Sequence, residues 1–164
     1  MIYFISDLHY NHANIIDYTS RQHQIATVEE MNNIIIKRWN KIVKNKDIVY
    51  CLGDFCFGNS TQIKDLVKKL KGNIILVKGN HDPVRSHQWY LNNGFYKYYD
   101  NPIIIDDFII VSHEPIKFLN KTMPYINIHG HTHDDCFDNK QRINVSWEIL
   151  DGYPIDYEKL KEMF

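Results

Sequence analysis

Short apolar segments that end in clusters of aspartate, histidine or asparagine recur along this chain. The five clusters are Asp7-Leu8-His9, Gly53-Asp54, Gly79-Asn80-His81-Asp82, Ser112-His113 and Gly130-His131-Thr132-His133. Each cluster lies at or just after an apolar run with the length and composition of a β-strand. We therefore expect each one to lie on a loop at the carboxyl end of a strand, where polar groups from several strands converge.

The first half of the chain alternates strand and helix patterns. The expected strands are 2–6, 47–52 and 73–78, and the expected helices are 27–43, 60–70 and 83–93. Thr27 followed by Glu30 has the capping-box pattern, and Pro83 suits the first turn of a helix. The second half contains mainly strands, expected at 102–105, 108–112, 125–129 and 141–145, the first two forming a hairpin. This order predicts parallel pairing early and antiparallel pairing late, in sheets covered by helices.

Length and composition indicate one globular domain. The chain has 164 residues without a linker or repeat, so we assign residues 1–164 to a single domain. The formal charge of −1 gives no support for a strongly basic nucleic-acid surface. Three cysteines without a C-x-x-C pair indicate reduced thiols rather than a disulfide framework. No apolar run is long enough to span a membrane, and the first residues lack a signal-peptide pattern, so we expect a cytoplasmic location.

The first two clusters offer carboxylate and imidazole ligands. Asp7 and His9 lie two residues apart, so their side chains share one side of an extended segment and can hold a divalent ion. A turn aspartate beside a surface histidine is the alternative. Asp54 leaves a buried strand, where a carboxylate is costly to bury unless a cation or hydrogen bonds compensate. Its two oxygens can bridge two metals, whereas a helix-cap or turn role is the alternative.

The later clusters add a neutral oxygen ligand and more imidazoles. Asn80 can bind a metal through its carbonyl oxygen, His81 can transfer a proton, and Asp82 can orient the His81 ring. A turn with a capping aspartate is the alternative for this segment. His113 alone is also compatible with a core position. His131 and His133 follow a glycine two residues apart, a spacing that suits adjacent metals.

In this order, the five clusters resemble the D-x-H, G-D, G-N-H-D, H and G-H-x-H motifs of the calcineurin-like metallophosphoesterase family. The resemblance spans Asp7 to His133, and every ligand position of the motifs is retained. The segments 6–16, 38–40 and 144–146 further resemble small bacterial and phage phosphoesterases. The resemblance implies an α/β (α+β) fold, a four-layer α/β/β/α sandwich in which helices flank two mixed β-sheets.

Carried over position by position, the resemblance implies two metal sites that share one carboxylate. The first site would consist of Asp7, His9, Asp54 and His133, and the second of Asp54, Asn80, His113 and His131. His81 would be the general acid, with Asp82 as its orienting partner. The cofactors implied are two divalent transition-metal ions, with manganese expected and iron, zinc, nickel or cobalt as alternatives.

A site of this kind would hydrolyse a phosphodiester or phosphomonoester through a metal-bridging hydroxide, while His81 protonates the departing oxygen. We expect a small-molecule or nucleotide phosphoester as substrate, and the oligomeric state is open. A nuclease acting on DNA or RNA is the alternative, and the net charge does not favour it. A non-catalytic binding protein with the same fold is a further alternative. It would lack some of the metal ligands or His81, and all of these residues are present in the sequence. Three residues are candidate substrate contacts, with surface or turn roles as alternatives: His12, Arg21 and Asn144.

Overall fold

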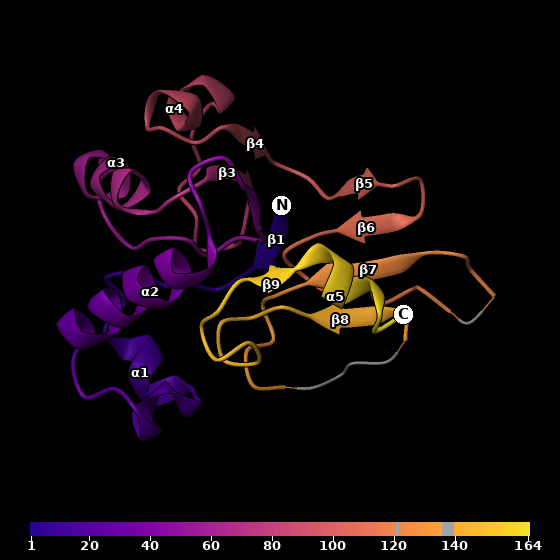
Figure 1. Cartoon of the computed structure of the whole chain (residues 1–164), viewed down its shortest axis with the longest axis horizontal. Coiled ribbons are helices and arrows are strands. Elements are labelled where there is room, and N and C mark those ends of the chain that lie inside the picture. Colours follow the sequence, from indigo (N-terminus) through magenta and orange to yellow (C-terminus); the bar gives the residue numbers. More distant parts are fainter. Residues whose placement is uncertain (121, 136–139) are drawn as a thin grey trace.

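The computed structural model describes residues 1–120, 122–135 and 140–164, which form two packed β-sheets with helices around them (Figure 1). The first sheet has the strand order β4-β3-β2-β1-β9. Its four parallel strands are β1 (Ile2–Ile5), β2 (Ile48–Cys51), β3 (Asn73–Val77) and β4 (Lys97–Tyr99). The edge strand β9 (Ile155–Asp156) pairs antiparallel with β1.

The second sheet has the order β5-β6-β7-β8. Its strands are β5 (Ile103–Ile105), β6 (Ile109–Val111), β7 (Ile126–His129) and β8 (Arg142–Asn144). The predicted β5–β6 hairpin is present. Ile105 pairs with Ile109, so the loop has three residues, and the first two have a positive φ, 47° at Asp106 and 64° at Asp107. The expectation of antiparallel pairing throughout this half is wrong, because β6–β7 and β7–β8 are parallel. The long segments between these strands allow the crossovers that parallel pairing requires.

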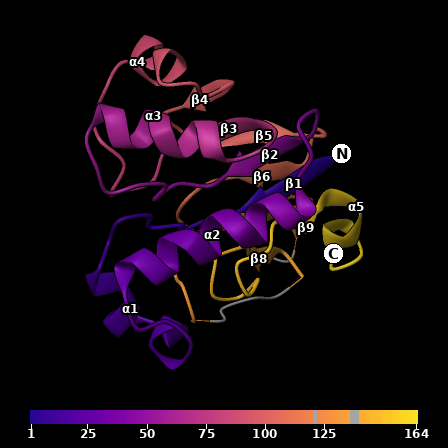
Figure 2. The same ribbon diagram turned by 60° about the vertical axis from the view of Figure 1, so that its left-hand side comes forward.

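Two long helices cover one face of the first sheet. They are α2 (Val28–Ile42) and α3 (Ser60–Lys69), which lie side by side in Figure 2. Met31, Ile35 and Trp39 recur at helical spacing on α2 and are buried against the sheet, in one cluster with Ile5 and Val49. This burial follows the apolar stripe expected of an amphipathic helix.

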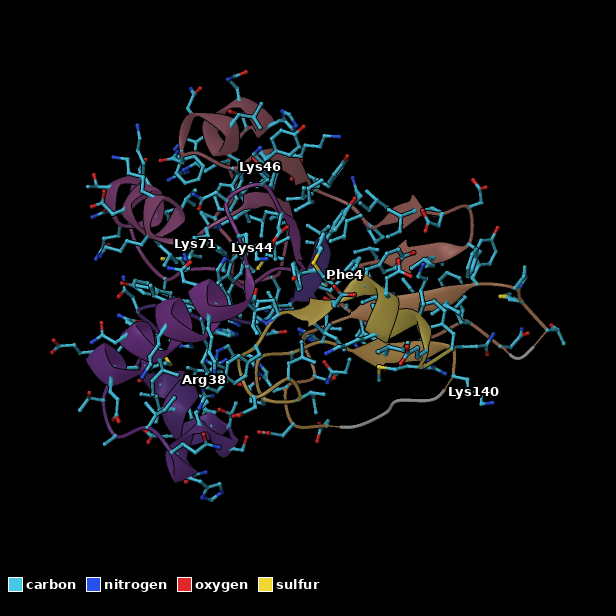
Figure 3. The ribbon with its side chains drawn as sticks, in the orientation of Figure 1. Phe4, Arg38, Lys44, Lys46, Lys71 and Lys140 are labelled. Atoms are coloured by element: carbon cyan, nitrogen blue, oxygen red, sulfur yellow. The ribbon has the colours of Figure 1, made fainter. Side chains whose placement is uncertain are left out.

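The opposite face of the first sheet packs against the second sheet. Phe4 is buried between them with Leu52 and Val77, facing Val111 and Ile128 (Figure 3). The alternation of side chains along a strand directs Phe4 to this layer and its neighbours Tyr3 and Ile5 to the helices. The helix α5 (Tyr157–Lys161) contacts β9 and β1 and adds Tyr157 and Leu160 to the layer. Two mixed sheets flanked by helices confirm the predicted fold class.

Helix starts depend on capping contacts. The Thr27 hydroxyl accepts the Glu30 N–H at 3.1 Å, as predicted. The next helix begins at Ser60, directly after Asn59, which forms a capping box with Gln62. The predicted start at Pro83 is wrong. The helix α4 (His87–Asn92) begins after Ser86, because the Asp82 carboxylate is bound by backbone groups elsewhere.

Shorter elements complete the fold. The helix α1 (Asn14–Tyr18) and the 3₁₀ turn η1 (Ser20–His23) follow β1 and lead into α2. The glycine at 152 packs its backbone closely against the Trp147 ring and adopts a φ of 69°. Of the helices that the structure describes, none has the length and apolar character needed to cross a membrane.

Candidate metal centre

The five polar clusters meet at one edge of the sheets. Asp7 and His9 follow β1, Asp54 follows β2, and residues 79–82 follow β3. These three strands are parallel neighbours in register, Ile5 beside Cys51 and Cys51 beside Leu76, so their carboxyl ends lie together. The second sheet adds His113 after β6, and residues 131–133 after β7. The predicted convergence of strand ends therefore follows from the observed topology.

One group of ligand-capable atoms consists of Asp7, His9 and His133, whose atoms lie within 4.8 Å of one another. Asp7 Oδ1 is 3.8 Å from Nε2 of His9 and 3.8 Å from Nε2 of His133. The Asp7 and His9 side chains are almost completely buried, whereas His133 is partly open. A carboxylate oxygen and two imidazole nitrogens thus face a common point.

Asp54 lies between this group and a second one. Its Oδ2 is 3.4 Å from His9 Nε2 and 3.5 Å from His113 Nε2, which places one carboxylate between two sets of donors. Beyond it, Asn80 Oδ1 lies 2.7 Å from His113 Nε2 and 3.0 Å from His131 Nδ1. The two imidazole nitrogens are 3.2 Å apart. The seven residues predicted as ligands are therefore brought together around Asp54.

Five of these seven residues have left-handed backbone conformations. Their φ angles are 58° at Asp7, 48° at His9, 52° at Asp54, 70° at His131 and 46° at His133. Non-glycine residues rarely adopt this region, although aspartate and histidine do so more readily than most. Each such residue costs on the order of 1–3 kcal/mol, and such conformations concentrate at functional sites. The loops are thus shaped to aim these side chains inward.

The backbone also approaches the ligands closely at two glycines. A Cβ atom at Gly79 would overlap the Asp54 carboxylate, and one at Gly130 would overlap Ser6 and the Asp7 carboxylate. The Gly130 position brings the N–H of His131 to 2.9 Å from Asp7 Oδ2, and Ser146 Oγ lies 3.1 Å from the same oxygen. These contacts fix Oδ2, while Oδ1 faces the histidines.

The site has the properties that a divalent metal requires. Among the described residues, Asp7 Oδ1 and His9 Nε2 are buried side-chain atoms without a hydrogen-bond partner, although such atoms are normally satisfied. Burial lowers the pKa of His9 to about 4, so its ring is neutral at pH 7. Burial opposes ionisation of Asp7, but the nearby rings of His9, His113 and His133 hold its pKa below the usual value. An anionic carboxylate together with imidazole nitrogens and an amide oxygen fits a transition metal.

Burial also raises the pKa of Asp54, although the His113 ring opposes this shift. The carboxylate therefore lies in an environment that disfavours its charge until a cation is supplied. The backbone N–H of His81 donates to Asp54 Oδ1 at 2.9 Å. That hydrogen bond leaves Oδ2 as the oxygen that faces His9 and His113.

The two predicted catalytic residues occupy different environments. His81 is exposed, and its ring lies 5.6 Å from that of His9, centre to centre. Asp82 is buried and accepts backbone hydrogen bonds from Asp54 at 2.9 Å, Phe55 at 3.0 Å and Gly79 at 2.8 Å. These contacts give Asp82 a role different from the predicted orientation of the His81 imidazole. It joins the loops after β2 and β3.

The three predicted substrate contacts also differ in placement. His12 lies at the mouth of the site, stacked on Phe57 at 3.9 Å between ring centres, with Nδ1 3.1 Å from His9 Nδ1. Arg21 is only 1% exposed and hydrogen bonds to Leu8 O and Glu148, an environment that favours a structural role. Asn144 is buried and donates to the backbone carbonyl of His133 at 2.9 Å, which supports the loop of this candidate ligand.

The site opens to solvent through a hollow of about 670 Å³. Its lining includes His12, His81, Tyr18, Asp134 and Asp135, together with ligands from both groups. A second depression of about 440 Å³ begins at Asn80 and His113 and extends along Lys78, Lys117 and Phe118. Sequence reasoning did not locate this depression, because it is formed by the folding of 112–118 against the end of β3.

Comparison with known proteins agrees with this geometry. Residues 1–162 match the family model described as calcineurin-like phosphoesterase, so the chain belongs to that family. An uncharacterized protein of Methanocaldococcus jannaschii is 33% identical over 171 residues, covering 99% of this chain and 90% of the relative. The crystal structure of a protein of unknown function from Aquifex aeolicus superposes with a TM-score of 0.75 at 28% identity, covering 100% of this chain and 99% of the other. The chain is thus a metal-dependent phosphoesterase, with candidate ligands for divalent metals.

Proposed function

We propose that this protein hydrolyses a small phosphomonoester or phosphodiester, such as a nucleotide, at a two-metal site. The observation that carries this proposal is the position of Asp54 Oδ2, 3.4 Å from one imidazole nitrogen and 3.5 Å from another. Asp7, His9 and His133 would hold one metal, and Asn80, His113 and His131 the other, with Asp54 shared. Two divalent metals, of which manganese is our first candidate, supply an acidified water and stabilise the charge on a phosphate.

The chain's own residues supply the proton and position the ester. The His81 imidazole is exposed, and its ring centre lies 5.6 Å from that of His9, so we infer that it can reach the oxygen that leaves phosphorus. Its backbone N–H meanwhile binds Asp54 Oδ1, so the same residue also fixes the shared carboxylate. His12 faces the same hollow, and its stacking on Phe57 limits the movement of its ring. We assign proton donation to His81 and a phosphate contact to His12.

The surroundings of the hollow favour a small substrate over a nucleic-acid backbone. Asp134 and Asp135 line the hollow and are exposed, so they repel a long polyanion. Lys44, Lys46 and Lys71 are also exposed, but they precede β2 and β3, at the strand ends opposite the ligands (Figure 3). The depression that begins at Asn80 and His113 carries Lys78 and Lys117 but also Asp100 and Glu114. Its lining is therefore mixed in charge, unlike the basic channel that a nuclease would use.

The test is a panel of esters on protein stripped with a chelator and refilled with single metals. The panel contains p-nitrophenyl phosphate, bis-p-nitrophenyl phosphate and simple nucleotides, with manganese, iron, zinc, nickel and cobalt in turn. We expect turnover with at least one metal, and at least a hundredfold less in Asp54→Asn. A matched control is Asp107→Asn, which changes an exposed turn aspartate. Absence of turnover with every metal, or full activity in Asp54→Asn, would overturn the proposal.

A further inference from the structure

A buried glutamate lies directly behind one of the metal-site histidines. Glu148 Oε2 is 3.1 Å from Nδ1 of His133, the ring nitrogen on the side away from Asp7. Its other oxygen, Oε1, accepts a hydrogen bond from Arg21 Nε at 2.7 Å. The Glu148 and Arg21 side chains are both completely shielded from solvent, so this ion pair lies in the protein interior rather than on the surface.

This contact sets the hydrogen position on the His133 ring. A carboxylate paired with a guanidinium is anionic and can only accept hydrogen bonds, so Nδ1 of His133 must carry the hydrogen. In the neutral ring the lone pair is then on Nε2, which faces Asp7 Oδ1 at 3.8 Å. Histidines that bind metals commonly give their other N–H to a carboxylate or carbonyl, which fixes the ring and makes it a stronger ligand.

Arg21 connects this glutamate to the first polar cluster. Its Nη1 donates to the carbonyl oxygen of Leu8 at 2.9 Å, and its Nη2 donates to that of Asp7. Its guanidinium also stacks on the Trp147 ring, 4.5 Å from the ring centre. Because the same guanidinium binds Glu148, the segment of Asp7 and the ring of His133 are held by one network. Asp7 and His133 are far apart in the sequence.

In the second ligand group, one histidine is held by an uncharged hydrogen-bond acceptor. His113 Nδ1 lies 2.7 Å from the carbonyl oxygen of Leu52, an uncharged acceptor. The corresponding acceptor at His133 Nδ1 is a carboxylate oxygen of Glu148. An imidazole backed by a carboxylate donates more electron density to a metal than one backed by a carbonyl.

We propose that Glu148 is a positioning residue that fixes the His133 tautomer and makes the Asp7–His9–His133 site the tighter of two metal sites. This inference rests on the proposed two-metal function. Sequence reasoning did not single out Glu148, because neither a motif nor local spacing links it to Arg21 or His133. The structure connects residues that are 127 and 15 positions apart.

The direct test compares metal binding in Glu148→Gln with the unchanged protein. Glutamine replaces one of the two carboxylate oxygens with an NH2 group, so either His133 Nδ1–H or Arg21 Nε–H would face a donor. Calorimetric titration with Mn²⁺ should show about 10- to 100-fold weaker binding at one site, with the other changed by less than about threefold. Asp151→Asn is the control, since it removes an exposed carboxylate three residues away that pairs with Arg38. Unchanged binding at both sites in Glu148→Gln would overturn the inference, as would an equal loss at both.

A second measurement uses the unchanged protein and so does not depend on the variant folding. Long-range ¹H–¹⁵N spectra of the metal-free protein report which nitrogen of His133 carries the hydrogen. We expect hydrogen on Nδ1, and hydrogen on Nε2 would overturn the inference. Neither measurement requires turnover. A protein that binds two metals with this asymmetry but hydrolyses no ester would refute the proposed function and leave the role of Glu148 intact.

Discussion

The Asp82 carboxylate accepts a hydrogen bond from the backbone N–H of Asp54, with 2.9 Å between oxygen and nitrogen. Two further N–H groups, of Phe55 and Gly79, donate to the same carboxylate. The loop that carries Asp54, the proposed shared ligand, is therefore anchored to the loop that carries Asn80 and His81. Burial raises the pKa of Asp82, while these three hydrogen bonds oppose that shift.

This anchoring predicts the effect of Asp82→Asn. The amide has one acceptor oxygen for three buried N–H groups, and its own N–H groups would face donors. We expect the metal-free protein to lose about 2–4 kcal/mol of unfolding free energy, from one or two unsatisfied donors. Urea unfolding followed by tryptophan fluorescence measures this loss. Asp107→Asn serves as control, and equal stability of both variants and the unchanged protein would contradict the anchoring role.

Replacing His81 separates proton donation from metal binding. In His81→Ala the backbone N–H that donates to Asp54 is retained, so we expect the metal content to stay the same. Turnover of an alkyl phosphate ester should fall about 100-fold or more, because its leaving oxygen needs a proton. A p-nitrophenyl ester should be much less affected. The measurement is kcat for both esters, with His87→Ala, on an exposed residue at the start of α4, as control. Equal losses on both esters would remove His81 from the acid role.

The neutral His9 ring gives the metal-free protein a defined pH dependence. Burial lowers its pKa in the folded protein from 6.5 to about 4, so between these values the unfolded chain binds more protons than the folded chain. The contribution of His9 to unfolding free energy therefore falls as the pH decreases through this window, by up to about 3 kcal/mol. An NMR titration of the His9 ring measures the pKa directly. A midpoint near 6.5 would show that burial does not control this ligand.

The positions of the candidate metal ligands were predictable because they are local features. Each cluster follows a strand, and parallel strands in register place their carboxyl ends together, as with Ile5, Cys51 and Leu76. The hairpin turn at Asp106 and Asp107 was equally readable, since two polar residues separate two apolar runs. Patterns of this kind depend on neighbours in sequence, and the structure places them as expected.

The supporting contacts were not predictable in the same way. Arg21 was considered as an exposed or phosphate-binding residue, yet it is buried against Leu8 and Glu148. Asp82 was assigned to its sequence neighbour His81, whereas its partners include Asp54, 28 positions away. No periodicity or spacing in the sequence indicates such contacts. They depend on how the loops fold over one another after the strands have paired.

The central claim is that two metals bound around Asp54 perform ester hydrolysis. The most direct measurement is a Mn²⁺ titration of the chelator-stripped protein, in which calorimetric binding and p-nitrophenyl ester turnover are followed on the same sample. We expect two ions to bind per chain and turnover to rise mainly with the second equivalent, with both properties lost in Asp54→Asn. Full turnover at one equivalent, or two ions bound without any turnover, would contradict the account.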